Sequence, residues 1–315
     1  MKNYISLSDI KDLQELIETS LKFKKQQTPL KIGQEKTLGM LFFNPSLRTR
    51  LSTEKAARNL GMEVMLMNAD RDGWALEFGE GTLMDSDKPE HVKEAAAVLS
   101  QYCDIIAVRA FPGLSDREQD AKDTVINSFK KYASVPVINL ESATGHPLQA
   151  LTDAVTITEH ATRKRPKVVL TWAPHPKALP QSVPNSFVEV MQKMEVEMVI
   201  TNPPGYDLDP KIRQQVPVVH DQLQALEDAD FVYVKNWSSY ESYGKVLSTD
   251  RSWIFNMEKL QKTNNAKIMH CLPVRRNVVI ADAVLDSPHS LVIEQARNRT
   301  FAAQAVLQKL LEGLP

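Results

Sequence analysis

The sequence is poor in the features that mark secreted, membrane-spanning and nucleic-acid-binding proteins. Its 315 residues include two cysteines, Cys103 and Cys271, too few for a disulfide framework and too far apart for a metal site. No apolar run reaches the roughly 18 residues of a membrane span, and the polar residues 1–14 do not resemble a signal sequence. The net charge of −1 does not favour nucleic acid or an acidic membrane as a partner. We therefore expect a cytoplasmic protein. No metal or other cofactor is expected.

Short apolar runs alternate with amphipathic stretches along the whole chain. The chain has 43% hydrophobic and 24% charged residues, ordinary for a globular enzyme, and its length allows one large domain or two of about 150 residues. Strands are predicted at 37–43, 62–68, 104–110, 136–140, 167–174, 197–202, 231–237, 267–272 and 291–295. Helices are predicted at 9–26, 47–60, 88–103, 122–133, 147–160, 185–194, 219–229 and 298–313. This alternation predicts an α/β fold with two doubly wound parallel-sheet domains joined by interdomain helices.

Residues 69–87 form a long excursion rich in glycine and aspartate between two of these elements. A loop of this length in a compact domain is usually functional or covered by a partner. No strand is followed by G-x-G-x-x-G, so the fingerprint of dinucleotide-binding proteins is missing.

The turn after the first strand carries Ser46-x-Arg48-Thr49-Arg50 and leads directly into a helix. Backbone N–H groups at a helix N-terminus, with hydroxyls and guanidinium groups beside them, bind a phosphate dianion well. The alternative is that Ser46 is only a helix cap and that the arginines face solvent.

Further cationic side chains follow other predicted strands. In a parallel sheet the ligand lies beyond the carboxyl ends of the strands, so these residues are expected to collect there. The set comprises Arg109, His146, His175, Arg275 and Arg276. Such a concentration of cations predicts a small, polyanionic ligand.

Two members of this set, and Cys271, also have a structural alternative. Pro147 after His146 could simply be the first residue of a helix. Arg109 lies in an otherwise apolar strand, where it could form a structural ion pair. Cys271 could be a small buried hydrophobic residue.

Together these motifs resemble those of the aspartate/ornithine carbamoyltransferases, and the resemblance covers nearly the whole chain. It depends on Ser46-x-Arg48-Thr49-Arg50, Arg109, His146-Pro147-x-Gln149, His270-Cys271-Leu272-Pro273 and Asn298-Arg299 followed by Gln304. The His-Cys-Leu-Pro motif is similar to that of the ornithine rather than the aspartate side of the family.

The resemblance implies a carbamoyl phosphate domain at residues 1–147 and an amino-acid domain at 148–296. Residues 297–315 are expected to form a C-terminal helix that packs back on the first domain. A homotrimer with shared active sites, which close on the substrates, is also implied.

The resemblance also implies roles for individual residues. The phosphate is expected on Ser46, the backbone of Leu47, Arg48, Thr49 and Arg299. Thr49, Arg109 and His146 should polarise the carbamoyl oxygen, where negative charge builds up during attack by an amine. Gln149 and the Leu272 carbonyl should hold the carbamoyl NH₂, and Trp74 should reach the site of a neighbouring subunit. The proton of the amine could pass to the departing phosphate or to Cys271.

The chain departs from ordinary ornithine carbamoyltransferases at Lys235-Asn236-Trp237. Those enzymes carry D-x-W there, whose aspartate neutralises the free α-ammonium of ornithine. A lysine would repel that ammonium, whereas an α-acylated ornithine is a net anion that Lys235 attracts. The alternative is that Lys235 points elsewhere in a rebuilt loop.

Two positions bear on the acyl group. The acetylornithine enzymes have a glutamate before the helix at 88–103 and a lysine after the Arg-Arg-Asn segment, and this chain has Pro89 and Val279 there. A proline leaves room for a succinyl carboxylate that a glutamate would repel, although Glu90 is adjacent and Pro89 could be a helix N1 proline. Arg276 is then expected to be the ligand's cation, and the other contacts are expected from Glu141, His175, Asn185 and Cys271.

These interpretations predict transfer of a carbamoyl group to the δ-amine of N-succinyl-L-ornithine in arginine biosynthesis. N-acetyl-L-ornithine is the alternative substrate. A non-catalytic sensor of carbamoyl phosphate or an acylated amino acid is the alternative from another class.

Overall fold

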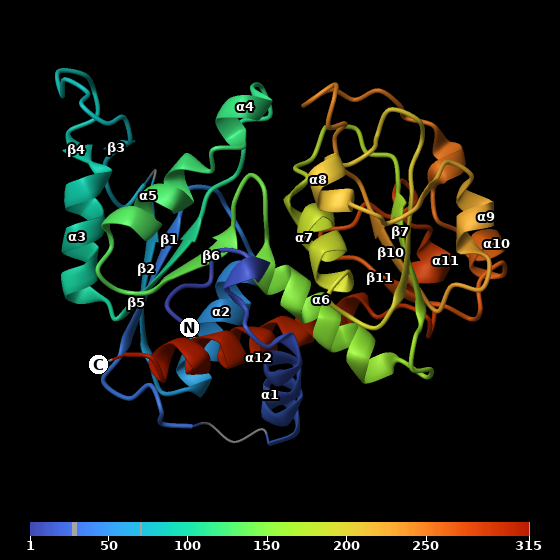
Figure 1. Cartoon of the computed structure of the whole chain (residues 1–315), viewed down its shortest axis with the longest axis horizontal. Coiled ribbons are helices and arrows are strands. Elements are labelled where there is room, and N and C mark those ends of the chain that lie inside the picture. Colours follow the sequence, from blue (N-terminus) through green and yellow to red (C-terminus); the bar gives the residue numbers. More distant parts are fainter. Residues whose placement is uncertain (27–29, 70, 315) are drawn as a thin grey trace. The chain divides into compact units, whose positions relative to one another are not determined.

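The computed structural model describes residues 1–26, 30–69 and 71–314. Its chain divides into two compact units (Figure 1). The first unit comprises residues 1–113, 118–151 and 299–315, and the second comprises 114–117 and 152–298. Helices α6 (Pro147–His160) and α12 (Val292–Leu311) each have residues in both units.

The first unit is built on a four-stranded parallel sheet with the order β2-β1-β5-β6. Its strands are β1 (Thr37–Phe42), β2 (Glu63–Asn68), β5 (Ile105–Arg109) and β6 (Val137–Glu141). The chain moves outward from β1 to β2 and then crosses to β5 on the other side of β1. Right-handed crossovers on opposite sides of a starting strand place their helices on opposite faces of the sheet. The order therefore reverses between β1 and β5, and a crevice is expected beyond their carboxyl ends.

The second unit has a five-stranded parallel sheet with the order β11-β10-β7-β8-β9. Its strands are β7 (Lys167–Trp172), β8 (Glu197–Thr201), β9 (Val218–Val219), β10 (Phe231–Lys235) and β11 (Lys267–Met269). Here the order reverses between β7 and β10, which places their carboxyl ends beside the second crevice. A small parallel pair, β3 (Leu76–Glu77) and β4 (Glu90–His91), lies in the first unit.

The remaining helices cover these sheets or connect their strands. In chain order they are η1 (Leu7–Asp9), α1 (Leu13–Gln26), α2 (Arg48–Asn59), α3 (Val92–Tyr102), α4 (Arg117–Asp120), α5 (Thr124–Tyr132), α7 (Ser182–Met191), α8 (Pro210–Arg213), α9 (Gln222–Leu226), η2 (Arg251–Trp253), α10 (Met257–Leu260) and α11 (Asp282–Leu285). None of the described helices combines the length and the apolar character that crossing a bilayer requires.

Each sheet has its own hydrophobic core. In the first unit, Val108 and Leu41 pack with Phe129 of α5 and Ala96 of α3. In the second, Val169 and Val234 pack with apolar residues of α9 and α11. Most strands read as continuous apolar runs because the parallel sheets are buried on both faces, whereas the edge strand β2 is partly exposed.

The predicted α/β fold with two parallel sheets is confirmed, and most predicted elements lie within a few residues of their observed bounds. The strand predicted at 291–295 is wrong, because α12 begins at Val292. There Gln295 N donates to the Leu291 carbonyl at 2.7 Å, and Ile293 faces solvent, as helical periodicity allows. The predicted strand 267–272 ends at Met269, and Leu272, with a φ of +57°, does not have strand geometry. Of the excursion at 69–87, Asp70 lies outside the described residues.

Candidate active site

The turn between β1 and α2 places Ser46, Leu47 and Arg48 at the carboxyl edge of the first sheet. Leu47 occupies the N-cap position and makes no side-chain cap hydrogen bond, so Ser46 is not the helix cap of the structural alternative. A cavity of about 430 Å³ opens beside the turn. Its lining comprises Phe42, Asn44, Pro45, Ser46, Leu47, Arg50, Asn68 and Arg71. A helix N-terminus beside two arginines is a strong site for an anion.

Arg109, the last residue of β5, is 5% exposed and bound on three sides. Its Nη1 donates to the carbonyl oxygens of Asn44 at 3.1 Å and Pro45 at 2.8 Å. Its Nη2 donates to Oε2 of Glu141 at 3.1 Å. The structural ion pair considered for Arg109 therefore exists, and it fixes the guanidinium at the crevice between β1 and β5. Burial lowers the pKa of Arg109, and the Glu141 carboxylate opposes that shift.

Pro147 is the first residue of α6, and His146 precedes it, separated from Glu141 by the four-residue turn 142–145. The Nε2 atom of His146 is 3.9 Å from Oε2 of Glu141. Burial lowers the pKa of His146 well below its ordinary 6.5, and the charges of Arg299 and Arg109 lower it further. At neutral pH the imidazole is therefore neutral and can donate one hydrogen bond without adding positive charge.

Arg299 of α12 connects two other predicted residues. Its Nη2 donates to the Thr49 hydroxyl at 2.7 Å, and its Nη1 donates to the Gln149 side-chain oxygen. Nearby, Gln304 accepts a hydrogen bond from Asn59 at 3.1 Å, which ties α12 to α2. The structure thus brings together Thr49, Arg109, Glu141, His146, Gln149 and Arg299 in the first unit.

In the second unit, two of the predicted contacts of the amino-acid substrate share one edge. His175 follows β7, and Lys235 ends β10 with 9% of its surface exposed. The Lys235 charge is near enough to lower the pKa of His175, although burial is the larger cause. Among the residues that the structure describes, the Lys235 ammonium has no hydrogen bond or ion pair.

Arg276, the predicted cation for the ligand, forms ion pairs on the surface of this structure. Its guanidinium binds Asp282 at 2.9 Å and Asp286 at 2.7 Å and 2.9 Å on the surface. These carboxylates already neutralise its charge. The neighbouring Arg275 instead donates from Nε to His175 Nε2 at 3.1 Å. Arg275 also belongs to the predicted cationic set, and nothing in the sequence distinguishes these two adjacent arginines.

The His-Cys-Leu-Pro turn, residues 270–273, follows β11, and a hydrogen bond to Gln295 of α12 fixes its start. His270 N donates to Gln295 at 2.9 Å, and Gln295 donates to the buried Asp153 at 2.7 Å. Leu272 N donates to His270 Nδ1 at 2.8 Å, which supports the left-handed backbone of Leu272. Cys271 is half-buried, so it is not the small, fully buried hydrophobic residue of the structural alternative. Asn185 lies in the first turns of α7, and Val279 lies in the hydrophobic core.

Trp74 lies on the 69–87 excursion, and Pro89 lies two residues beyond it. The Trp74 ring is 59% exposed, and its Nε1 donates to Glu90 Oε2 at 2.6 Å. Pro89 precedes β4, and His91 is the N-cap of α3, so Pro89 is not a helix N1 proline. The carboxylate of Glu90 is thus bound to Trp74, while Pro89 is exposed.

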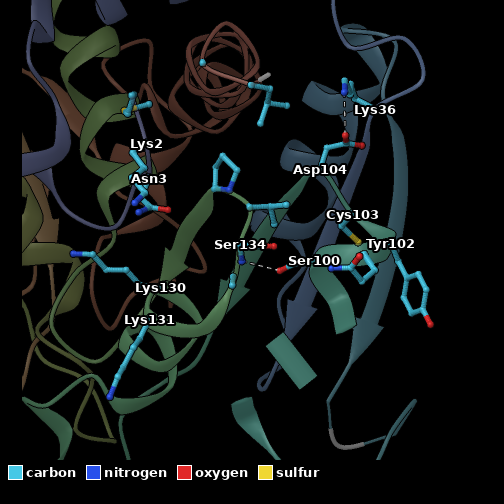
Figure 2. Close-up of a pocket in the computed structure, with 17 residues that line it drawn as sticks. Lys2, Asn3, Lys36, Ser100, Tyr102, Cys103, Asp104, Lys130, Lys131 and Ser134 are labelled. Carbon is cyan, nitrogen blue, oxygen red and sulfur yellow. Dashed lines mark hydrogen bonds and ion pairs between the residues drawn. The ribbon is translucent and has the colours of Figure 1, made fainter. Parts of the chain in front are cut away.

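A larger cavity in the first unit, of about 950 Å³, contains none of the predicted site residues (Figure 2). Its lining includes Lys36, Asp104 and Pro136, which immediately precede β1, β5 and β6. It therefore lies at the amino edge of the sheet. Among the described residues, no group of three or more His, Cys, Asp or Glu could hold a metal ion.

The chain matches two protein-family models in succession. Residues 2–159 match the carbamoyl-P binding domain of aspartate/ornithine carbamoyltransferase, and residues 180–310 match its Asp/Orn binding domain. The chain belongs to the aspartate/ornithine carbamoyltransferase family. The predicted resemblance is thereby confirmed.

Individual carbamoyltransferases are similar over the full length. The chain is 50% identical to N-succinylornithine carbamoyltransferase of Bacteroides fragilis, with 100% of both chains covered. It is 36% identical to N-acetylornithine carbamoyltransferase of Xanthomonas campestris, covering 99% of this chain and 98% of that one. A crystal structure of an N-acetyl-L-ornithine transcarbamylase variant, with one glutamate replaced by proline, contains carbamyl phosphate and N-succinyl-L-norvaline. It is 36% identical, covers 98% of this chain and 100% of that one, and has a TM-score of 0.92.

The lowered pKa of His146 predicts a pH dependence of stability. Below pH ~6.5 the unfolded chain takes up a proton at this residue that the folded chain does not, so the free energy of unfolding falls as the pH falls. Between pH ~7.5 and ~5.5 the wild type should lose roughly 1.4 kcal/mol more than His146→Gln, which cannot titrate there. Urea unfolding of both proteins at the two pH values measures this difference, and equal losses would contradict a neutral, buried His146.

Proposed function

We propose that this enzyme transfers the carbamoyl group of carbamoyl phosphate to the δ-amine of N-succinyl-L-ornithine. The products are N-succinyl-L-citrulline and phosphate, and the reaction belongs to arginine biosynthesis. The observation that carries this proposal is the 50% identity, over both full chains, with an N-succinylornithine carbamoyltransferase. N-acetyl-L-ornithine is the second candidate, because relatives that carry that name are 36% identical.

Carbamoyl phosphate binds the first unit. Its phosphate lies at the N-terminus of α2, on Ser46, the Leu47 backbone, Arg48 and Thr49. The site has the properties that such a dianion needs, because α2 lacks a side-chain cap and Arg299 already contacts Thr49. Charge that grows on the departing phosphate is offset by these arginines.

The carbamoyl oxygen accepts hydrogen bonds from Arg109, His146 and Thr49. Attack on the carbamoyl carbon moves negative charge onto this oxygen, and donors fixed beforehand stabilise that charge without reorganising. Glu141 and two backbone carbonyls hold Arg109 in place, which supports such a role. Gln149 and the Leu272 carbonyl hold the carbamoyl NH₂.

The attacking amine must lose a proton, since a primary amine of this kind has a pKa of roughly 10.4. The departing phosphate and Cys271 are the candidate acceptors. Within the cluster around Arg109, Glu141 is bound to the guanidinium, and burial lowers the pKa of His146, so both are poorer acceptors.

The acylated ornithine binds the second unit through Lys235, His175, Asn185 and Cys271, with Glu141 from the first unit. Acylation removes the α-ammonium and leaves a net anion, which suits a nine-tenths buried lysine with no protein partner among the described residues. Arg275 takes the place of Arg276 as the second cation, because it is hydrogen-bonded to His175.

Pro89 is the determinant of the succinyl group. A proline in place of a glutamate removes a charge that would repel the distal carboxylate of succinate. The glutamate-to-proline variant of an N-acetyl-L-ornithine transcarbamylase was crystallised with N-succinyl-L-norvaline, which supports this reading. The proposed assembly is a homotrimer in which Trp74 reaches the site of a neighbouring subunit, as its large exposed ring allows.

Citrulline formation with ornithine, N-acetylornithine and N-succinylornithine, at equal concentration with carbamoyl phosphate, tests the proposal. We expect turnover of the succinyl compound and at most slow turnover of the others. Preference for the acetyl compound would agree with the role of Lys235 in selecting an acylated ornithine and would contradict the role of Pro89 in selecting the succinyl group. Turnover of free ornithine would contradict the argument from Lys235, and inactivity on all three would favour a sensor.

Pro89→Glu should shift the preference from N-succinylornithine towards N-acetylornithine, because it places a carboxylate against the succinyl carboxylate. The ratio of the two kcat/KM values should fall by at least tenfold, the scale of roughly 1.4 kcal/mol of repulsion. Leu83→Glu adds the same charge at an exposed position of the adjacent 69–87 excursion and serves as the control. An unchanged ratio in Pro89→Glu would remove Pro89 from the acyl site.

A further inference from the structure

The turn Ser142–Gly145 connects the two residues that face Arg109. Glu141, the last residue of β6, precedes it, and His146 follows it. The turn closes on itself, because Ser142 N donates to the Gly145 carbonyl at 2.8 Å. Any displacement of this turn would move Glu141 and His146 together.

A single carboxylate, that of Asp123, binds three consecutive residues of this turn. Its Oδ1 accepts a hydrogen bond from Ala143 N at 2.8 Å. Its Oδ2 accepts one from the Ser142 hydroxyl at 2.9 Å and another from the Thr144 hydroxyl. Asn139 of β6 donates to the same Ser142 oxygen at 3.1 Å, so the turn is also tied to the sheet.

Asp123 binds the 142–145 turn instead of capping its own helix. It is the N-cap residue of α5, a position where aspartate normally accepts hydrogen bonds from the first N–H groups of the helix. Here its φ is +45°, in the left-handed region, and its side chain makes no cap hydrogen bond. The carboxylate turns away from its own helix and towards the 142–145 turn, in an environment where burial raises its pKa.

We propose that Asp123 is a positioning residue for carbamoyl transfer, which holds the Ser142–Gly145 turn so that Glu141 and His146 keep their places beside Arg109. This inference depends on the proposed function, in which His146 and Arg109 polarise the carbamoyl oxygen. Asp123 itself touches neither substrate. Its effect passes through Glu141, which fixes the guanidinium, and through the start of α6.

The test compares Asp123→Ala with Asp120→Ala and with Asp123→Asn. Asp120, three residues earlier, is the matched control. Its Oδ1 accepts a backbone hydrogen bond at 2.9 Å, but the donor is Gly113 N and not a residue of the 142–145 turn. Asp123→Ala should lower kcat by roughly 10- to 100-fold, the scale of a displacement of about 1 Å in an active site. KM for N-succinylornithine should change less than about twofold, since most of its contacts lie in the second unit.

Asp123→Asn should recover most of the lost kcat. Its amide oxygen can still accept from Ala143 N, and its NH₂ can donate to the Thr144 hydroxyl, so two of the three bonds remain; the Ser142 oxygen already accepts from Asn139 and Gly145 N. If Asp123→Ala fails to fold, Thr144→Ala removes one of the three bonds at an exposed residue and should lower kcat severalfold. A kcat within about twofold of wild type in folded Asp123→Ala or in Thr144→Ala would overturn the proposal, as would an equal loss in Asp120→Ala.

The His146 ring resonances, assigned by comparison with His146→Gln, give a readout that needs no turnover. They should shift in Asp123→Ala and remain in place in Asp120→Ala. Wild-type inactivity on all three ornithines would contradict the proposed function alone. Unshifted His146 resonances in Asp123→Ala would contradict the role of Asp123, whatever the wild type catalyses.

Discussion

The cluster in the first unit depends on the contacts that stabilise the buried charge of Arg109, at the point where the strand order of the sheet reverses. Arg109 lies between β1 and β6 with almost no exposed surface, and an unpaired guanidinium there would cost several kcal/mol. Glu141 and the carbonyls of Asn44 and Pro45 compensate that cost. Since the same carbonyls precede Ser46, their hydrogen bonds with Arg109 also fix the start of the turn between β1 and α2. Arg299 returns on α12 to bind Thr49 and Gln149, so the donors are in place before a substrate arrives.

The two units divide the chemistry in a way that follows from their sheets. Each parallel sheet has one reversal of strand order, and each reversal collects polar residues that follow different strands. The first unit offers cations and a neutral histidine, which suit a phosphate and a developing oxyanion. The second offers a nearly buried lysine and a histidine–arginine pair, which suit an anionic amino acid. The carbamoyltransferase family membership of the chain agrees with this division.

Local patterns in the sequence predicted most of the fold and the first-unit site, because buried strands and the turn after β1 are defined by neighbouring residues. Features that depend on distant partners could not be predicted. Arg275 and Arg276 have the same chemistry, and only the placement of Asp282 and Asp286 decides which one is neutralised. Asp123 gave no signal, since its partners lie about 20 residues away on another element. The helical start at Val292 was missed because a short apolar run fits a strand equally well.

A crystal structure of this enzyme with carbamoyl phosphate and N-succinyl-L-norvaline tests the account most directly. Norvaline lacks the δ-amine, so both ligands should remain intact and in place. The account predicts the phosphate at the N-terminus of α2, the carbamoyl oxygen within hydrogen-bond distance of Arg109 and His146, and the succinyl carboxylate beside Pro89. A carbamoyl oxygen that contacts neither Arg109 nor His146, or a succinyl group remote from Pro89, would contradict it.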